Sequence, residues 1–155
     1  MRLLCDEMLH RLGRWLRAAG YDTAIISSGL RDRELIERCI AEGRILLTKD
    51  RQLASAARKA IRVVLLVGGS IDADARAIAD ALGLDWQHAP FTRCVIDNAR
   101  LVPAAPKYEA HVPLNARASG GPVFVCPACG RIYWFGGHVR RMRRRLVSWK
   151  REGGG

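Results

Sequence analysis

Short apolar runs alternate with longer amphipathic segments along the first half of the chain. Runs with the length and composition of buried strands occupy residues 3–5, 21–26, 44–48 and 63–67. Apolar residues at helical spacing occupy about 8–19, 32–42, 50–60 and 71–82. Strands separated by helices of this length form right-handed βαβ units. The pattern therefore predicts a small doubly wound α/β domain over residues 1–88, with helices on both faces of a parallel sheet.

The pattern changes near residue 90. Prolines interrupt the sequence at positions 90, 103, 106, 113 and 122, and long helical periodicity is absent until the final segment. There Val139, Met142, Leu146 and Trp149 recur at helical spacing with arginines between them, which predicts an amphipathic basic helix with one apolar stripe docked on the protein. We therefore expect a second module over residues 89–150 and a flexible tail at 151–155.

Two of the predicted strands end at an aspartate. Asp6 follows the first and Asp50 follows the third, while Asp32 opens the helix after the second. Because the carboxyl ends of parallel strands share one rim, where open α/β sheets bind ligands, these acids are expected to converge there. Glu34 is a further candidate. Clustered carboxylates suit Mg²⁺ or Mn²⁺, although each aspartate could instead cap its own helix.

The charge is unevenly distributed. Of the net charge of +11, residues 1–90 contribute +2 and residues 91–155 contribute +9. This asymmetry favours a polyanionic partner, with solubility alone as the alternative. The candidate phosphate-binding residues near the acidic rim are Arg14, Arg17, Lys49 and Arg51, and those on the terminal helix are Arg140, Arg141 and Arg144. Either group could also be a solvated helix face, and the terminal helix could lie on a membrane surface.

Targeting signals are not evident in the sequence. The longest aliphatic run, residues 63–67, is far shorter than the roughly 20 residues that span a bilayer. The acid at position 6 comes too early for a secretory signal peptide. We therefore expect a cytoplasmic protein without a membrane partner. In that compartment cysteines are typically metal ligands or buried, and we expect Cys5 and Cys39 to be core residues.

The remaining cysteines have the spacing of a zinc site. Cys126 and Cys129 are separated by two residues and followed by glycine, so both thiolates can reach one tetrahedral ion. The matching upstream pair is Cys94 and Asp97, with 28 residues between Asp97 and Cys126. Aspartate oxygen binds zinc, so we expect Asp97 as the fourth ligand. The alternatives are a histidine, such as His111 or His138, or a module without metal.

Several ordered motifs resemble one family. They are the segments at 4–9, 12–22, 32–36, 44–50, 91–94 and 126–134. Together they resemble the Mut-seven C-terminal ribonuclease domain family, in which a PIN-like ribonuclease domain precedes a zinc ribbon. The resemblance extends from Arg2 to about Met142. It implies that Asp6, Asp32 and Asp50 correspond to acidic metal-site positions, and that Asp97 stands where the family usually has cysteine.

The resemblance and the residues together predict a metal-dependent ribonuclease. Mg²⁺ or Mn²⁺ at the aspartates would activate water for attack on a phosphodiester. The zinc ribbon and basic helix would bind nucleic acid, and we expect this nucleic acid to be RNA rather than DNA. One alternative is a non-catalytic RNA-binding or ribosome-binding zinc-ribbon protein with a vestigial acidic site. Another is a module that binds a protein partner.

Overall fold

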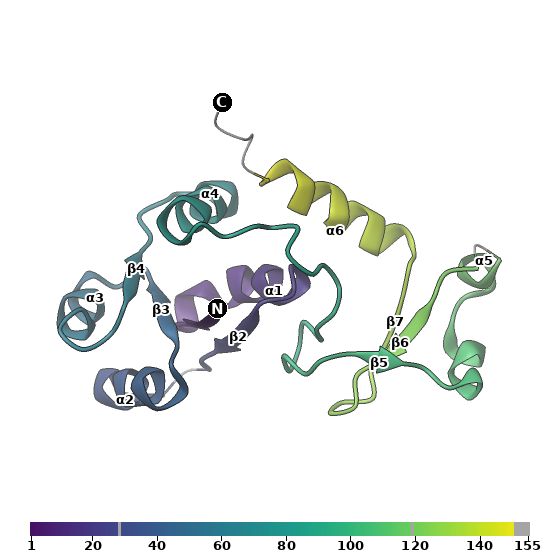
Figure 1. The fold of residues 1–155 in the computed structure, drawn as a ribbon, viewed down its shortest axis with the longest axis horizontal. Helices are drawn as coiled ribbons and strands as arrows, with labels where there is room; N and C mark the ends of the chain where they lie inside the picture. Colours follow the sequence, from purple (N-terminus) through teal and green to yellow (C-terminus); the bar gives the residue numbers. More distant parts are fainter. Residues whose placement is uncertain (28, 119, 151–155) are drawn as a thin grey trace.

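The computed structural model describes residues 1–27, 29–118 and 120–150 (Figure 1). The expected tail at 151–155 lies outside the described residues. The first part of the chain contains, in order, β1 (Arg2–Cys5), the 3₁₀ helix η1 (Glu7–Leu9), α1 (His10–Ala18), β2 (Asp22–Ile25), α2 (Asp32–Glu42), β3 (Ile45–Thr48), α3 (Arg51–Ala57), β4 (Val63–Leu65) and α4 (Ile71–Leu82). The predicted alternation of strands and helices is confirmed.

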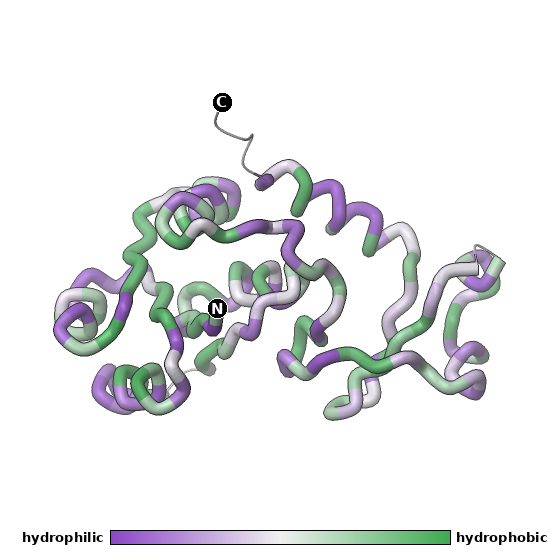
Figure 2. The backbone as a smooth tube through the Cα atoms, viewed as in Figure 1, coloured by the Kyte–Doolittle hydropathy of each residue, from purple (hydrophilic) through white to green (hydrophobic). Residues whose placement is uncertain are grey.

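The four strands form a parallel sheet in the order β2-β1-β3-β4. Alternate residues of β1 face opposite sides, because successive side chains of a strand do. Leu3 and Cys5 pack in one apolar cluster with residues of α1 and α4, whereas Leu4 packs in another with residues of α2 and α3. Helices therefore cover both faces, as the doubly wound prediction requires. Figure 2 shows the hydrophobic strands between helices whose outer turns are hydrophilic.

Some element boundaries differ from those the sequence predicts. The first helix is divided into η1 and α1, because Asp6 caps a short 3₁₀ turn before the α-helix starts. The fourth strand ends at Leu65 rather than at residue 67, and the side chain of Val67 is 74% exposed. An apolar residue just beyond a strand continues the sequence pattern even where the backbone has left the sheet. Helix α2 has the predicted bounds.

The second part of the chain is built on a small antiparallel sheet. Its elements are β5 (Val102–Pro103), η2 (Pro106–His111), α5 (Leu114–Arg117), β6 (Val123–Val125), β7 (Ile132–Trp134) and α6 (Gly137–Ser148). The strands pair in the order β5-β6-β7. The turn between β6 and β7 carries Cys126 and Cys129, so this sheet is the predicted ribbon.

Arg17 joins the ribbon to the first sheet. Its side chain is buried and donates hydrogen bonds to the carbonyl oxygens of Thr23 (2.8 Å), Val95 (3.1 Å) and Ile96 (2.6 Å). The expectation that Arg17 contacts phosphate at the acidic rim is not met, because the side chain is 6% exposed and its Nε and Nη1 atoms donate to backbone carbonyl oxygens inside the protein. Arg17 lies in the last turn of α1, which places the ribbon junction at the end of the sheet where β2 begins, opposite the end that carries Asp6.

The close approach of the ribbon segment also explains a glycine. Gly20 has a φ of +97°, and a Cβ atom there would lie 2.3 Å from the carbonyl oxygen of Ala89. The backbone amides of Ala89 and Phe91 donate to the carbonyl oxygens of Ala19 and Ala18. Only glycine allows the chain to pass this close with this backbone conformation.

Helix α6 returns to the first sheet and joins its core. Leu146 and Trp149 belong to the apolar cluster formed by β1, α1 and α4, so the predicted docking of the apolar stripe is confirmed. The Trp149 ring lies 5.1 Å from that of Trp15 and 4.9 Å from that of Trp86, and its Nε1 donates to Asp72 Oδ1 at 2.7 Å. The terminal helix thus shares a core with the sheet domain. Among the helices of the described segments, none is long and apolar enough to cross a membrane.

A second junction is built around Asp22. Its Oδ1 accepts hydrogen bonds from Arg44 Nη1 and Asn98 Nδ2, both at 2.8 Å, and its Oδ2 accepts from Arg2 Nε at 3.2 Å. Burial favours the neutral acid, but the hydrogen bonds from Arg44 and Asn98 outweigh it and lower the pKa of Asp22 to about 2. Asp22 therefore links the start of β2 to the ribbon segment as a carboxylate.

We expect Arg17→Met to lower the free energy of unfolding by about 3 kcal/mol, because it leaves buried carbonyl oxygens without donors. Arg14→Met is the matched control, since Arg14 is exposed one turn earlier in the same helix and its loss should change stability by less than about 0.5 kcal/mol. Urea unfolding followed by circular dichroism measures both. Equal effects of the two substitutions would contradict the assigned role of Arg17.

We expect acid to lower the free energy of unfolding, in part through protonation of Asp22. Its folded pKa lies below the unfolded value of about 3.9, so the carboxylate stabilises the fold above about pH 4, and this stabilisation is lost as the pH falls towards 2. The stabilisation that is lost amounts to about 2 kcal/mol. Asp22→Asn should flatten the dependence of unfolding free energy on pH between about 4 and 2, whereas Glu37→Gln, at an exposed helix pair, should retain the parent's slope.

Candidate functional site

Three aspartates from separate segments line one pocket. Asp6 follows β1, Asp50 follows β3 and Asp32 begins α2. Because β1 pairs directly with β3, the first two acids lie on neighbouring strand ends. Glu7 also lines the pocket, and its apolar wall is formed by Met8, Ile26, Leu30, Leu35 and Leu53. The arrangement is a carboxylate-lined depression at the carboxyl end of the sheet.

Asp6 and Asp50 are held by the backbone and by one shared hydroxyl group. Asp6 is 5% exposed, and its Oδ1 accepts from the Met8 amide at 3.0 Å. The Thr48 hydroxyl donates to Asp6 Oδ2 and accepts from the Asp50 amide at 2.9 Å. Thr48 therefore fixes the two acids relative to each other. Sequence reasoning missed this residue, although its position at the strand end between an apolar run and Asp50 is a usable signal.

Helix capping uses only one of the two carboxylate oxygens of Asp50. Its Oδ1 accepts from the amides of Gln52 (2.8 Å) and Leu53 (3.0 Å). Within the described residues its Oδ2 has no hydrogen bond. The side chain of Asp32 is exposed and forms no hydrogen bond within the described residues. Capping and a place in the pocket are therefore compatible for Asp50, and Asp32 can turn its carboxylate towards a ligand.

Two expected members of the site are engaged elsewhere. Glu34 accepts a hydrogen bond from the Arg31 amide at 2.9 Å and pairs with the Arg31 guanidinium at 2.8 Å. Lys49 Nζ lies 2.8 Å from both Asp74 Oδ2 and the Gly68 carbonyl oxygen. Glu34 thus closes the first turn of α2 outside the pocket, and Lys49 ties β3 to the start of α4. In the structure both side chains therefore have local partners, and neither is among the residues that line the pocket.

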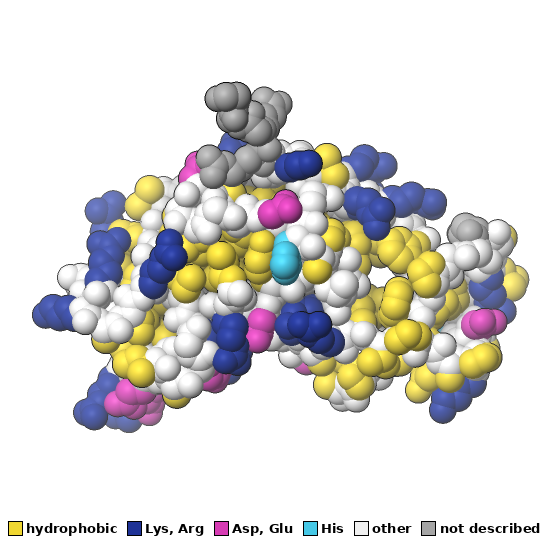
Figure 3. Space-filling model, viewed as in Figure 1, with side chains coloured by type: hydrophobic (Ala, Val, Ile, Leu, Met, Phe, Trp, Pro, Cys, Tyr) yellow, Lys and Arg dark blue, Asp and Glu magenta, His cyan; other side chains and the backbone are white. Residues whose placement is uncertain are grey.

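Apart from the buried Arg17, the arginines that were predicted to bind phosphate are exposed. Arg14 lies on α1, Arg51 is the first residue of α3, and Arg140, Arg141 and Arg144 lie on the outer face of α6. By contrast, Arg145 pairs with Asp72 at 3.1 Å. Figure 3 shows Lys and Arg side chains gathered over α6.

The aspartates are more widely spaced than the cysteine cluster. Among the described residues, only one set of possible metal ligands has all its ligand atoms within 4.8 Å of one another. It consists of Cys94, Asp97, Cys126 and Cys129. Asp6, Asp32 and Asp50 line their pocket without this close approach. Mg²⁺ usually takes one or two protein carboxylates directly and keeps several waters, so it does not require all three side chains to meet at one point.

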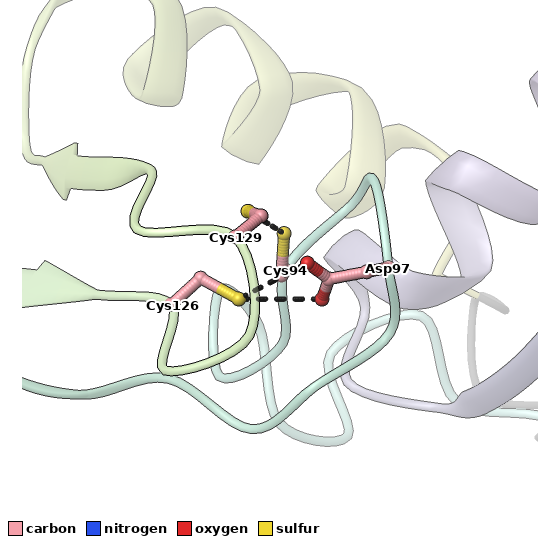
Figure 4. Close-up of side chains that lie close together, drawn as sticks. All are labelled: Cys94, Asp97, Cys126 and Cys129. Carbon is pink, nitrogen blue, oxygen red and sulfur yellow. Dashed lines mark hydrogen bonds between the residues drawn. The ribbon is translucent and has the colours of Figure 1, made fainter.

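The four predicted zinc ligands come together (Figure 4). Cys94 Sγ lies 3.8 Å from Cys129 Sγ, and Cys126 Sγ lies 3.2 and 3.3 Å from the two oxygens of Asp97. Tetrahedral zinc would place two thiolates about 3.8 Å apart and a thiolate and a carboxylate oxygen about 3.5 Å apart. The donor set and its spacing therefore fit one zinc ion. Among the described residues neither His111 nor His138 belongs to the cluster.

Tyr133 supports this cluster and was not anticipated from the sequence. Its hydroxyl lies 3.0 Å from Cys94 Sγ and accepts from the Val95 amide at 3.3 Å. Burial disfavours the Cys94 thiolate, but hydrogen bonds led by that from Tyr133 lower the pKa of Cys94. Burial also opposes ionisation of Asp97, yet hydrogen bonds led by that from Cys129 lower its pKa to about 2. The charged forms that metal requires are therefore favoured at Cys94 and Asp97, whereas burial raises the pKa of Cys126 to about 12.

The remaining two cysteines are structural. Cys5 and Cys39 are buried in the two apolar clusters on either side of the sheet, as expected. Burial raises the pKa of both thiols, that of Cys39 to about 11. They are therefore neutral core residues rather than ligands or nucleophiles.

Comparison with known proteins identifies the family of the chain. The sequence profile described as the Mut7-C RNAse domain matches residues 1–146. The chain belongs to the Mut7-C RNase domain family. The match includes the sheet domain, the ribbon and most of α6, so the resemblance inferred from the sequence motifs is confirmed. No curated protein and no solved structure matches the chain. A ribonuclease domain is thus shown at the level of the family.

We expect the purified protein to contain about one zinc ion per chain, measured by elemental analysis. Asp97→Ala should release zinc to a weaker chelator than the parent does, because one ligand is lost. Asp97→Cys should hold zinc more tightly, since thiolate is the softer ligand. Cys39→Ala removes a thiol outside the cluster and should leave the zinc content unchanged. A parent protein without stoichiometric zinc would contradict the assignment.

Proposed function

We propose that the protein is a metal-dependent ribonuclease whose active site is the pocket lined by Asp6, Asp32 and Asp50. The observation that carries the proposal is their convergence at the carboxyl end of the parallel sheet in a chain of a ribonuclease-domain family. Open α/β sheets place their ligands at this end. Carboxylate oxygens are the ligands that Mg²⁺ and Mn²⁺ prefer.

In this proposal the side chains of the pocket have separate roles in binding the cation and the substrate. Asp6 is fixed by the Met8 amide and the Thr48 hydroxyl, and Asp50 keeps one oxygen outside its capping bonds in the described structure. A divalent cation bound there supplies water activation and offsets the charge that develops on the phosphodiester. Arg51 lies next to Asp50 and is exposed, so in this proposal it binds a substrate phosphate. Arg14, which is exposed on α1, is the second such candidate.

Helix α6 and the ribbon supply nucleic-acid affinity in this proposal. The helix begins beside the ribbon, and its last turn reaches Asp72 at the start of α4. Because α4 follows β4, this last turn lies at the same end of the sheet as the aspartates. Arg140, Arg141 and Arg144 therefore form a basic path directed from the ribbon towards that end. Guanidinium groups bind phosphate without reading sequence, and the family assignment favours RNA over DNA.

The cellular compartment is part of the same proposal. All five cysteines are free thiols, and three of them form the cluster with Asp97. Thiols persist in reducing compartments, which supports a cytoplasmic location.

One observation favours a second function. Asp6 and Asp50 each accept capping hydrogen bonds from the following turn, and this alone accounts for an aspartate at each position. The alternative is a non-catalytic protein that binds RNA or a ribosomal surface through the ribbon and α6. It predicts RNA binding without cleavage.

The experiment is cleavage of labelled single-stranded RNA by the full chain in Mn²⁺. Asp6→Asn and Asp50→Asn should each reduce the rate at least about a hundredfold, which corresponds to about 2.7 kcal/mol of transition-state stabilisation. Asparagine still caps helices, so the fold is retained.

The matched control is Glu34→Gln. Glu34 lies in the first turn of α2, near Asp32 in sequence, but faces Arg31 instead of the pocket, so this variant should cleave at the parent's rate. If both aspartate variants cut as fast as the parent, the pocket is not the active site. RNA binding by a parent protein that does not cleave RNA would support the alternative.

A further inference from the structure

A second pocket lies between the ribbon and α6. Its wall is formed mainly by the aromatic side chains of Phe91, Phe124, Tyr133, Trp134 and Phe135. All five are half-buried, so the rings are partly open to solvent. Arg93 also lines the pocket. In Figure 3, hydrophobic side chains lie exposed over the ribbon, beside the Lys and Arg side chains over α6.

Two rings of this pocket lie beside a guanidinium group. Phe91 and Phe135 meet edge to face, with centroids 6.4 Å apart and planes at 81°. The Arg143 guanidinium lies 5.8 Å from the Phe91 centroid and 5.4 Å from that of Phe135. Both contacts are within the range of cation–π attraction. Arg143 thus holds the two rings at one side of the pocket.

Phe91 has an unusual backbone. Its φ is +62°, in the left-handed region that a bulky side chain rarely adopts. The Phe91 amide donates to the Ala18 carbonyl oxygen at 2.7 Å, so the sheet domain holds it in this conformation. Such strained positions are concentrated at ligand sites. The junction of the two modules therefore fixes one ring of the pocket.

The surroundings of the pocket are basic. Residues 91–155 contribute +9 of the net charge, and Arg140 and Arg144 are exposed on the helix that forms one wall. Half-buried aromatic faces beside guanidinium groups complement a polymer that carries flat bases on an anionic backbone. Proteins that bind single-stranded nucleic acid combine these two features.

We propose that this pocket binds an unpaired base of single-stranded RNA by stacking, while the arginines of α6 bind the adjacent phosphates. The inference rests on the proposed function for the identity of the polymer, and adds to it a binding subsite away from the acid pocket. Duplex RNA does not fit this role, because its bases are stacked on each other and its accessible surface is shape and backbone.

The position of the pocket gives it a distinct role in the reaction. The ribbon joins the sheet domain at the last turn of α1, through Arg17 and Phe91, whereas Asp6 and Asp50 lie at the opposite end of the sheet. The aromatic pocket therefore anchors RNA at a distance from the cleavage site. Its loss should weaken substrate binding without altering the chemistry at the aspartates.

The test measures binding by fluorescence anisotropy in the Asp6→Asn/Asp50→Asn background, so that cleavage cannot interfere. The two probes are a fluorescein-labelled oligouridylate and an abasic ribose-phosphate oligomer of the same length. Trp134→Leu/Phe135→Leu keeps the pocket apolar but removes two aromatic faces. We expect the double change to weaken oligouridylate binding about tenfold and to leave abasic binding unchanged. Arg140→Ala/Arg144→Ala should weaken both probes alike.

Tyr108→Leu is the matched control, because Tyr108 is a half-buried aromatic residue of the same module outside the pocket. It should bind both probes as the parent does, and thermal melting checks that each variant is folded. Unchanged oligouridylate binding in a folded Trp134→Leu/Phe135→Leu protein would overturn the proposal, as would equal weakening of both probes. The proposal would also be overturned if the double change weakened the binding of duplex RNA as much as that of the single strand. Base-dependent binding by a parent that does not cleave RNA would refute only the nuclease function.

Discussion

Parallel pairing of β1 with β3 is the constraint on which the acid pocket depends. The Asp6 amide donates to the Leu47 carbonyl oxygen, and Thr48 at the end of β3 bonds to both Asp6 and Asp50. Pairing in this register places two carboxylates on adjacent strand ends although they are distant in sequence. The apolar residues of both strands stabilise the register, because a shift by one residue would move them to the wrong face of the sheet.

The molecule separates two kinds of chemistry at opposite ends of the sheet. Hard oxygen donors line the pocket at the carboxyl end, whereas thiolates and aromatic rings belong to the ribbon docked near the amino end. Arg17 and Asp22 hold the ribbon there through carbonyl and amide groups of both parts. Helix α6 connects the two ends, since Trp149 is packed in the core beside α1 and α4. Its exposed arginines are thereby fixed relative to the acid pocket.

The cysteine cluster shows how a small module without a large core of its own is held together. Cys126 and Cys129 lie on the turn between β6 and β7, and Cys94 and Asp97 lie on the loop that Arg17 anchors. One ion at these ligands would join the ribbon to the junction with the sheet domain. Because binding of a structural ion contributes to the free energy of folding, the affinity of these ligands for an ion would also affect the stability of this junction.

The sequence by itself determined the α/β class, the order of elements, the bounds of α2, the four residues of the Cys–Asp cluster and the apolar stripe of α6. These depend on local periodicity, strand-end acids and short ligand spacing, all of which are written along the chain. Tertiary structure alone decided that Arg17 is buried against carbonyl groups, that Lys49 pairs with Asp74 and Glu34 with Arg31, and that Thr48 and Tyr133 support the two sites. A polar side chain takes whichever partner folding brings near, and that partner can lie anywhere in the sequence. Hydrophobic periodicity records which face is buried but not which donor meets which acceptor.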